Sequence, residues 1–528
     1  MKKNITSVLI LASIALGTQA QELKTKANWQ NLDYEKDGIR GMSVERAYEE
    51  LLKGRPSQPV VVAVIDGGTD IYHEDLKDKI WTNTKEIAGN NKDDDKNGFI
   101  DDIHGWDFIG GKDGRDVHHE QLELTRIYKQ LQSKFGHPTP QKLIDKNKEE
   151  YDFYQKLGTE FEEKSMESKQ SVQFYQQILD NYLESEKILK EYLHTEQLSP
   201  EKVEAIEDNE AEKKIRSAKQ TYKRFSSMGI TAQDIKEGIE HFENEEKYNY
   251  NLDFDGRSVV GDKPNKLEYG AYGNNEVVGP DAMHGSHVAG IIAANRNNNL
   301  GIKGVCENVQ IMVVRTVPDG DERDKDVANA IRYAADNGAM IINMSFGKKY
   351  SPNKKWVDDA VKYAQSKGVL MIAAAGNDNL DTDVEKHYPT DTYENGSTAV
   401  NWISVGALSW KSGVNGVASF SNYGKNTVDV FAPGVDIYST VPGSKYEEKS
   451  GTSMAAPATT GVAAMLKSYF PNLSASEIKE IILKSSVKLN EEVNKPGTSK
   501  KVNFSELSLT GGVVNAYQAV KMAIERGK

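Results

Sequence analysis

A run of small residues near the C-terminal end of the chain strongly limits how it can fold. Gly451-Thr452-Ser453-Met454-Ala455-Ala456-Pro457 is followed by further Gly, Ala and Thr residues. Side chains this small let two backbones approach closely, and the apolar ones suit a helix that other elements surround. We therefore predict a buried helix that begins near Ser453, with Pro457 in its first turn, where the missing N–H costs nothing. The Ser453 hydroxyl at the start of such a helix is a candidate nucleophile.

A serine is a weak nucleophile at neutral pH and needs a base that an acid orients. Asp66 follows the continuous apolar run Val60–Ile65, the pattern of a strand buried on both faces of a parallel sheet. The carboxyl ends of such strands are where open α/β sheets place their sites. His284 precedes a glycine-flexed apolar segment that we predict to be a helix. Its imidazole titrates near neutrality, as a general base should.

These three segments together resemble the subtilisin-like serine proteases, or subtilases, whose catalytic residues follow the chain order Asp, His, Ser. The resemblance implies that Asp66 orients the imidazole, His284 takes and returns the proton, and Ser453 attacks the scissile carbonyl. A fourth match is the apolar strand that ends at Asn377, whose amide donates to the oxyanion in this family, an interaction worth about 3 kcal/mol. The sedolisins use carboxyl groups as base and oxyanion partner, so His284 and Asn377 argue against them.

Each of these residues also has an ordinary structural interpretation. Alone, Asp66 is a turn residue after a strand, Gly-Thr-Ser is a common loop, and Asn377 after a glycine suits a left-handed turn. Their joint occurrence in the family order, each on the expected kind of element, favours catalysis.

The resemblance also implies a substrate-binding edge. Ile341–Gly347 looks like the strand that pairs with an extended substrate backbone, a recognition mode that relies on main-chain hydrogen bonds. Ser345, Phe346 and Gly347 would line one wall of the primary pocket, and Ala375 and Gly376 the facing wall. His387-Tyr388-Pro389 approaches the pocket floor without an assigned role. The alternative is a core strand that ends in a glycine turn.

An acidic loop carries the cofactor signal. Asp93-Asp94-Asp95-Lys96-Asn97-Gly98-Phe99-Ile100-Asp101 matches the first part of an EF-hand-type calcium loop, with Gly at the sixth position, although His104 replaces the Glu at the twelfth. We predict a structural calcium ion; the alternative is a hydrated acidic turn. The predicted ligands are Asp93, Asp95, Asn97, the Phe99 carbonyl and Asp101. Asp253, Asp255 and Asp262 form a second candidate group.

The composition changes near Asp116. Residues 117–250 are rich in Glu, Lys, Gln and Tyr and nearly free of Gly. Ser199-Pro200 and Thr231–Asp234 read as starts of two helices. A longer amphipathic helix precedes them, and its apolar stripe contains Val172, Tyr175, Leu179, Tyr182, Leu189 and Leu193. We predict an inserted helical hairpin or small bundle. It could gate the cleft, bind a protein partner or mediate self-association; alternatively, the stripe only holds the helices together.

The remaining chain alternates apolar strands and helices. This pattern predicts an α/β fold with a mostly parallel central sheet and helices on both faces. A subtilisin-like peptidase domain would then span residues 60–116 and 251–528. Residues 21–59 are too few for the folding propeptide of many secreted subtilases, so we expect an N-terminal arm or a short pro-segment there.

Residues 1–20 have the pattern of a bacterial signal peptide. Lys2-Lys3 precedes an apolar core, and Thr18-Gln19-Ala20 forms a small-residue cleavage site. We therefore expect a secreted or periplasmic protein with no membrane span after signal cleavage. The net charge of −13 disfavours nucleic acid as a partner, and the single cysteine, Cys306, excludes intramolecular disulfides.

These observations predict a secreted serine endopeptidase that cleaves extended polypeptides through an acyl-enzyme intermediate. The chain has no zinc-finger spacing and no phosphate-cradling glycine loop, so we expect no organic cofactor. Two alternatives stay open at this point. One is a catalytically silent scaffold that binds partners through the helical insertion, and the other is a small-ester hydrolase.

Overall fold

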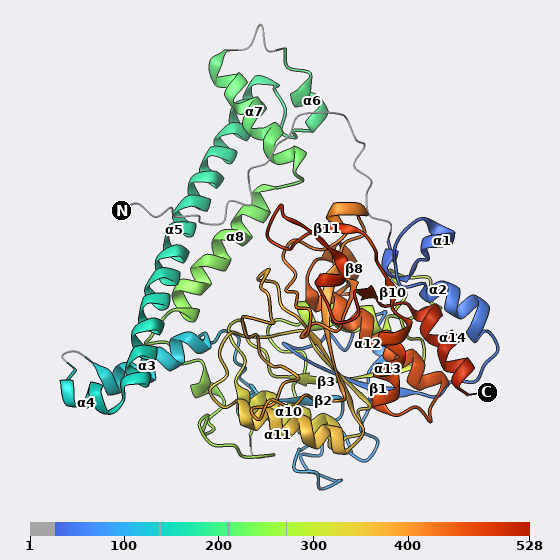
Figure 1. Cartoon of the computed structure of the whole chain (residues 1–528). Coiled ribbons are helices and arrows are strands. Elements are labelled where there is room, and N and C mark those ends of the chain that lie inside the picture. The colour runs from blue at the N-terminus through green and yellow to red at the C-terminus, as the bar shows by residue number, and fades with distance from the viewer. Residues whose placement is uncertain (1–26, 137–138, 208–211, 271, 528) are drawn as a thin grey trace.

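The computed structural model describes residues 27–136, 139–207, 212–270 and 272–527, so the predicted signal segment lies outside it. Within these residues, a nine-stranded sheet has the strand order β10-β13-β7-β6-β5-β4-β1-β3-β2 (Figure 1). Neighbouring strands pair in parallel except for the edge pair of β10 and β13. The strands are β1 (Val60–Asp66), β2 (Gly105–Asp107), β3 (Val309–Arg315), β4 (Ile341–Met344), β5 (Leu370–Ala374), β6 (Trp402–Leu408), β7 (Val430–Pro433), β10 (Val487–Lys488) and β13 (Gly512–Val513).

Strand β1 explains why the sheet is covered on both faces. Val62 and Val64 point into one hydrophobic core, while Ala63 and Ile65 point into the other, as the period of two along a strand requires. Helices α9, α12, α13 and α14 cover the first face, and α10 and α11 the second (Figure 1). These helices are α9 (Met283–Ala293), α10 (Asp324–Asp336), α11 (Lys354–Ser366), α12 (Thr452–Tyr469), α13 (Ala475–Ser485) and α14 (Ala516–Arg526). The predicted α/β class is confirmed.

Helix α12 is buried along most of its length, as the small residues indicate, but one detail differs from the prediction. The helix begins at Thr452, so Pro457 is its sixth residue and lies beyond the first turn. Proline has no N–H, and the Ser453 carbonyl therefore lacks the donor that the residue four positions later normally supplies. The hydroxyl of Ser345 replaces that donor, with its Oγ 2.9 Å from the Ser453 carbonyl oxygen.

The N-terminal segment is part of the main core. Trp29, Met42 and Val44 are buried in the same cluster as α9, α12 and α14, and the Trp29 indole donates to the carbonyls of Val435 and Asp436. Its helices are α1 (Tyr34–Asp37) and α2 (Val44–Arg46), which runs into a π-helical turn over Ala47–Leu52.

Two short hairpins lie outside the central sheet. One pairs β8 (Ile437–Val441) with β9 (Lys445–Lys449), and the other pairs β11 (Glu492–Asn494) with β12 (Lys501–Asn503).

A helical arm projects from the α/β body (Figure 1). Its helices are α3 (Glu123–Phe135), α4 (Gln141–Lys146), α5 (Lys148–Tyr192), α6 (Pro200–Glu204), α7 (Lys213–Ser227) and α8 (Ala232–Asn244). Helix α5 has 45 residues, and its stripe residues Leu179, Tyr182 and Leu189 are buried in a cluster with residues of α7 and α8. Ser199 and Thr231 cap α6 and α8 as predicted.

The base of the arm contacts the segment that follows β4. Glu160 of α5 accepts hydrogen bonds at 2.7 Å from both the Lys349 ammonium and the Tyr350 hydroxyl. Next to them, the buried Lys348 ammonium lies 2.8 Å from a carboxylate oxygen of Glu123 on α3. In the part of the chain that the structure describes, no helix is both long enough and apolar enough to cross a membrane.

Candidate active site

Asp66 and His284 are in direct contact although 218 positions separate them in the sequence. Asp66 is the last residue of β1 and is buried, and His284 lies in the first turn of α9 with 41% of its side chain exposed. The imidazole Nδ1 is 2.8 Å and 3.0 Å from the two carboxylate oxygens. A carboxylate only accepts hydrogen bonds, so Nδ1 carries the proton and the lone pair lies on Nε2.

Two glycines allow this close approach of α9 to the end of β1. A Cβ added at Gly285 would overlap the carbonyl oxygen of Gly68, which itself has a positive φ of 128°. Gly67 N–H donates to Asp66 Oδ1 at 2.8 Å and helps to fix the carboxylate. A side chain at position 67 would press on the Val317 carbonyl, 3.1 Å from the added Cβ, which is a physical reason for glycine there.

The electrostatics of His284 suit a base that is oriented by an acid. Burial disfavours the imidazolium, but the charge and hydrogen bond of Asp66, together with Asp281, hold the pKa of His284 above its ordinary value. The neighbouring His287 behaves differently: burial lowers its pKa to about 4, and its Nε2 contacts the carbonyls of Ile437 and Glu447. His287 is therefore a neutral core residue, and only His284 of this pair faces a cavity.

Ser453 lies beside the same cavity through its contact with Ser345. A cavity of about 200 Å³ is lined by Asp66, His284, Ser345 and Phe346 among others. The Ser453 hydroxyl donates to the Ser345 carbonyl at 3.0 Å, and the Ser345 hydroxyl donates back to the Ser453 carbonyl at 2.9 Å. The structure thus brings the predicted serine and the predicted substrate edge into contact, and it directs the Ser453 hydroxyl at Ser345 rather than at His284.

Asn377 is held in one orientation by the residue next to Ser453. Its Oδ1 accepts hydrogen bonds at 2.9 Å from both the backbone N–H and the hydroxyl of Thr452. The Asn377 amide NH2 therefore points away from Thr452, and its nitrogen would lie 3.6 Å from a Cβ added at Gly451. Thr452 also accepts from the Gly376 N–H at 3.1 Å. An exposed amide donor thus lies beside the first turn of α12.

The predicted pocket walls lie on either side of one imidazole. Ser345, Phe346 and Gly347 follow β4, while Ala375 and Gly376 follow the adjacent parallel strand β5. A Cβ added at Gly347 would overlap the His387 imidazole, and one added at Gly376 would lie 2.9 Å from its Cε1. The segment with His387 is bonded to this edge, because Lys348 and Tyr388 exchange two backbone hydrogen bonds of 2.8 Å.

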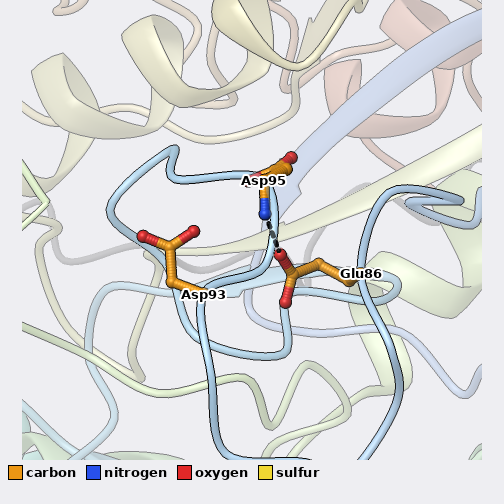
Figure 2. A group of neighbouring side chains, drawn as sticks. All are labelled: Glu86, Asp93 and Asp95. Atoms are coloured by element: carbon orange, nitrogen blue, oxygen red, sulfur yellow. Dashed lines mark hydrogen bonds between the residues drawn. The ribbon is translucent and has the colours of Figure 1, made fainter.

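The acidic loop gathers three carboxylates, and one of them lies outside the predicted ligand set. Glu86, Asp93 and Asp95 have ligand atoms within 4.8 Å of one another (Figure 2). Glu86 also accepts the backbone N–H groups of Asp94, Asp95 and Asp101 and so helps to shape the loop. Such oxygen-only donors are what calcium prefers.

Asn97 and Asp101, two further predicted ligands, accept hydrogen bonds from nearby backbone N–H groups. The Asn97 Oδ1 accepts from the Phe99 N–H at 2.8 Å, and the Asp101 carboxylate accepts from the N–H groups of Asn90 and Asn91. At the second candidate group, Asp262 is instead paired with the side chains of Arg257 and Lys325. Protein cations thus already neutralise Asp262, which removes the reason for a second ion there.

The sequence profile described as "Subtilase family" matches residues 57–505. The chain belongs to this family. Subtilases are serine-type endopeptidases, and the relatives of this subtilase at 36–41% identity include proteins named thermophilic serine proteinase, thermitase and subtilisin BL. It is 41% identical over 238 residues to a thermophilic serine proteinase of Bacillus sp. (strain AK1), a match that covers 45% of this chain and 52% of that protein. It is 39% identical over 239 residues to thermitase of Thermoactinomyces vulgaris, with 45% and 75% covered.

A protease from Pseudoalteromonas arctica PAMC 21717 matches this subtilase with 27% sequence identity and a TM-score of 0.40, over 49% of this chain and 81% of that one. The chain spans about half the length of the Bacillus proteinase and three quarters of thermitase.

Sequence reasoning left two supporting residues of this subtilase without a role. Thr452 stands inside the serine motif, but its bond to Asn377 joins two segments 75 positions apart. Glu86 precedes the acidic loop by seven positions, outside the window in which ligand spacing is recognised. Neither contact has a local sequence signal.

Proposed function

We propose that this subtilase is a serine endopeptidase that hydrolyses peptide bonds of extended polypeptides through Asp66, His284 and Ser453. The observation that carries the proposal is the contact of Asp66 with His284 Nδ1 at 2.8 Å and 3.0 Å. It leaves the basic Nε2 available in a cavity that Ser345, the hydrogen-bond partner of Ser453, also lines.

In the proposed mechanism, the Ser453 hydroxyl turns from the Ser345 carbonyl to His284 Nε2 when substrate binds. Oγ attacks the scissile carbonyl carbon while Nε2 takes the hydroxyl proton, and the carbonyl electron pair moves onto oxygen. The C–N bond then breaks as the imidazolium returns the proton to the amine. A water molecule repeats these steps on the acyl-enzyme ester, with His284 again as the base.

Two further groups stabilise the charges that form along this path. The Asp66 carboxylate fixes the tautomer of the neutral imidazole and stabilises the imidazolium that forms from it. The Asn377 amide, whose oxygen Thr452 holds, donates to the oxyanion. Because both groups are oriented before substrate arrives, they require little reorganisation during the reaction.

The geometry favours this function over the two alternatives. A silent scaffold would not need a buried Asp66 that orients His284 in a cavity. A small-ester hydrolase would not need the continuation of β4, where the partly exposed Phe346 and Gly347 provide main-chain groups for pairing with an extended chain.

The proposal is tested by labelling with a fluorophosphonate probe. We expect the wild type to become labelled at Ser453 and the Ser453→Ala variant to stay unlabelled. Circular dichroism should show that both proteins are folded. Folded wild type that takes up no label would support the scaffold. Labelled protein that hydrolyses short esters but leaves a peptide library intact would support the ester hydrolase.

We also propose a structural calcium ion at Glu86, Asp93 and Asp95. The three carboxylates are close enough to share one cation, and the ion would balance their mutual repulsion. Isothermal titration with calcium should show one binding event that Asp93→Asn weakens. Identical heats with and without protein would exclude the ion.

We propose that the protein is exported, because residues 1–20 have the signal-peptide pattern. N-terminal sequencing of protein from the periplasm or medium should start at Gln21. Cytoplasmic protein that retains its first twenty residues would contradict export.

We further propose that the helical arm is a protein contact surface. Met166 and Phe174 of α5 are 60% and 51% exposed, which leaves apolar surface of the arm available to a protein partner. Light scattering should show self-association that Phe174→Ser weakens. A concentration-independent monomer would leave a different protein as the partner and would be followed by crosslinking at α5.

A further inference from the structure

His387 occupies the space between the two predicted walls of the substrate pocket. Its Nε2 would collide with a side chain at Gly347, and its Cε1 and Nε2 would lie 2.9 Å and 3.0 Å from a Cβ at Gly376. Gly376 has a φ of 103°, a conformation that favours glycine. Only glycine at both positions leaves room for the imidazole, which therefore lies directly against both backbones.

A cavity also borders this imidazole. A cavity of about 490 Å³ is lined by His387 together with Ala374, Ala375, Trp402 and Ser404. Gly347 and Gly376 are not among its lining residues, although both contact the imidazole. His387 thus borders this cavity and also contacts the two glycines of the walls, and Ala375 of the facing wall lines the cavity as well.

We propose that His387 sets the depth of the substrate pocket and restricts it to short side chains, those of Ala, Ser and Thr, at the residue whose carbonyl Ser453 attacks. This inference rests on the proposed endopeptidase function and deepens it by naming the substrate class. The reason is steric: a long aromatic or aliphatic side chain would have to occupy the volume that the imidazole fills.

The chemistry of the imidazole favours short uncharged side chains over acidic ones. Burial lowers the pKa of His387, although Asp378 opposes this effect, so the ring is neutral at neutral pH. A neutral ring beside Asp378 offers no net positive charge to a substrate carboxylate. Among the residues that the structure describes, no hydrogen-bond partner is found for its nitrogens, which leaves them available to a Ser or Thr hydroxyl.

The first experiment uses the full-length wild type and a peptide series that differs only at the residue before the cleaved bond. We expect kcat/KM for Ala and Ser to exceed that for Phe and Leu by at least about tenfold, the scale of discrimination for steric fit in a pocket. Equal or better cleavage after Phe or Leu would overturn the proposal, and so would a preference for Glu. This measurement needs no variant.

The second experiment removes the imidazole. In His387→Ala the pocket should open into the neighbouring cavity, so kcat/KM for Phe should rise by about tenfold or more while that for Ala changes little. His387→Gln, which refills the space, should keep the wild-type preference for short side chains. Glu385→Ala is the matched control on the same segment, because Glu385 is exposed and lines neither cavity. An unchanged profile in folded, active His387→Ala would overturn the proposal.

The failures of the two proposals are distinguishable. If the endopeptidase function is wrong, neither wild type nor variant reacts with a fluorophosphonate, and no peptide of the series is cleaved. If only the role of His387 is wrong, both proteins are labelled at Ser453 and cleave the series with the same profile.

Discussion

Ser345 and Ser453 exchange two hydrogen bonds, each from the hydroxyl of one residue to the main-chain carbonyl of the other. The exchange joins the substrate edge after β4 to the first turn of α12. One of the two bonds compensates for Pro457, which cannot supply the usual donor to the Ser453 carbonyl. The position of the candidate nucleophile therefore depends on a residue of the candidate binding edge.

Replacement of Ser345 by Ala should destabilise the protein and slow catalysis. The Ser453 carbonyl and the Asn343 amide would both lose a buried partner, which costs about 2 kcal/mol of unfolding free energy. Because α12 then loses a restraint at Ser453, we expect kcat to fall more than KM rises. Urea unfolding and steady-state kinetics measure the two effects.

The matched control restores the missing donor. In Ser345→Ala/Pro457→Ala the N–H of residue 457 can again reach the Ser453 carbonyl, so the double variant should recover part of the lost stability. If the changes in unfolding free energy of the two single variants add up to that of the double variant, Pro457 and Ser345 are not coupled through this carbonyl.

The orientation of Asn377 predicts a graded loss of turnover. Asn377→Ala should lower kcat by about two to three orders of magnitude with little change in KM, because the amide acts on the oxyanion and not on the bound substrate. Thr452→Val should lower kcat less, since it removes only the hydroxyl that holds the amide oxygen. Thr452→Ser keeps that hydroxyl and is the control. A Thr452→Val variant with wild-type kcat would mean that the backbone N–H alone orients Asn377.

Local sequence patterns predicted the elements well, and they predicted less of the contacts between them. The run Val60–Ile65 and the cap at Thr231 need only neighbouring residues, and both are confirmed. Pro457 was misplaced because the exact first residue of a buried helix has no separate signal. Lys348 carried no signal, since its partners come from other segments that only the tertiary fold brings near, and Glu86 lies outside the window in which ligand spacing is recognised.

Asp66→Asn should change the pH dependence of activity as well as its size. The base must be neutral, and the charge of Asp66 holds the pKa of His284 above its ordinary value, so wild-type activity should fall on acidification through that raised pKa. Without the charge, the acidic limb should move to lower pH, and kcat should fall by about four orders of magnitude. Profiles of kcat/KM against pH measure this.

The same pair also predicts a sign for stability. A raised pKa in the folded state stabilises the protein at pH values below the ordinary His pKa, and this contribution is lost as the pH rises through the raised value. The difference in unfolding free energy between wild type and Asp66→Asn should therefore shrink between about pH 5 and about pH 9 at constant salt concentration. A difference that grows with pH would contradict the assignment.

The acidic loop predicts that calcium protects against heat. Calcium at about one hundred times its dissociation constant should add about 2.7 kcal/mol to the free energy of unfolding, and chelation should remove it. Glu86→Gln should lose most of this dependence, whereas Asp78→Asn, exposed and outside the cluster, should keep it. Scanning calorimetry with calcium or chelator distinguishes the cases. Equal melting temperatures for wild type in both conditions would exclude a bound ion.

Lys348 links the base of the arm to the binding edge, and its removal should be costly. Its ammonium is 2.8 Å from Glu123 on α3 and 2.9 Å from Asp324 on α10, and all three side chains are buried. In Lys348→Met, Arg126 still pairs with Glu123, but Asp324 loses its cation. We expect a loss of about 3 kcal/mol, the lower end for breaking a buried ion pair. The exposed neighbour Lys349→Met should cost much less.

The pH dependence of this loss separates an electrostatic cause from a packing defect. Burial alone would raise the pKa of Glu123, but Arg126 and Lys348 hold it below its ordinary value. That depressed pKa stabilises the wild type above the ordinary Glu pKa, and the contribution is lost as the pH falls through the folded-state value. Lys348→Met should therefore lose less stability on acidification than the wild type. Urea unfolding between about pH 7 and about pH 3 should show that the unfolding free energies of the two proteins converge on acidification. Free energies that fall in parallel would indicate a packing defect.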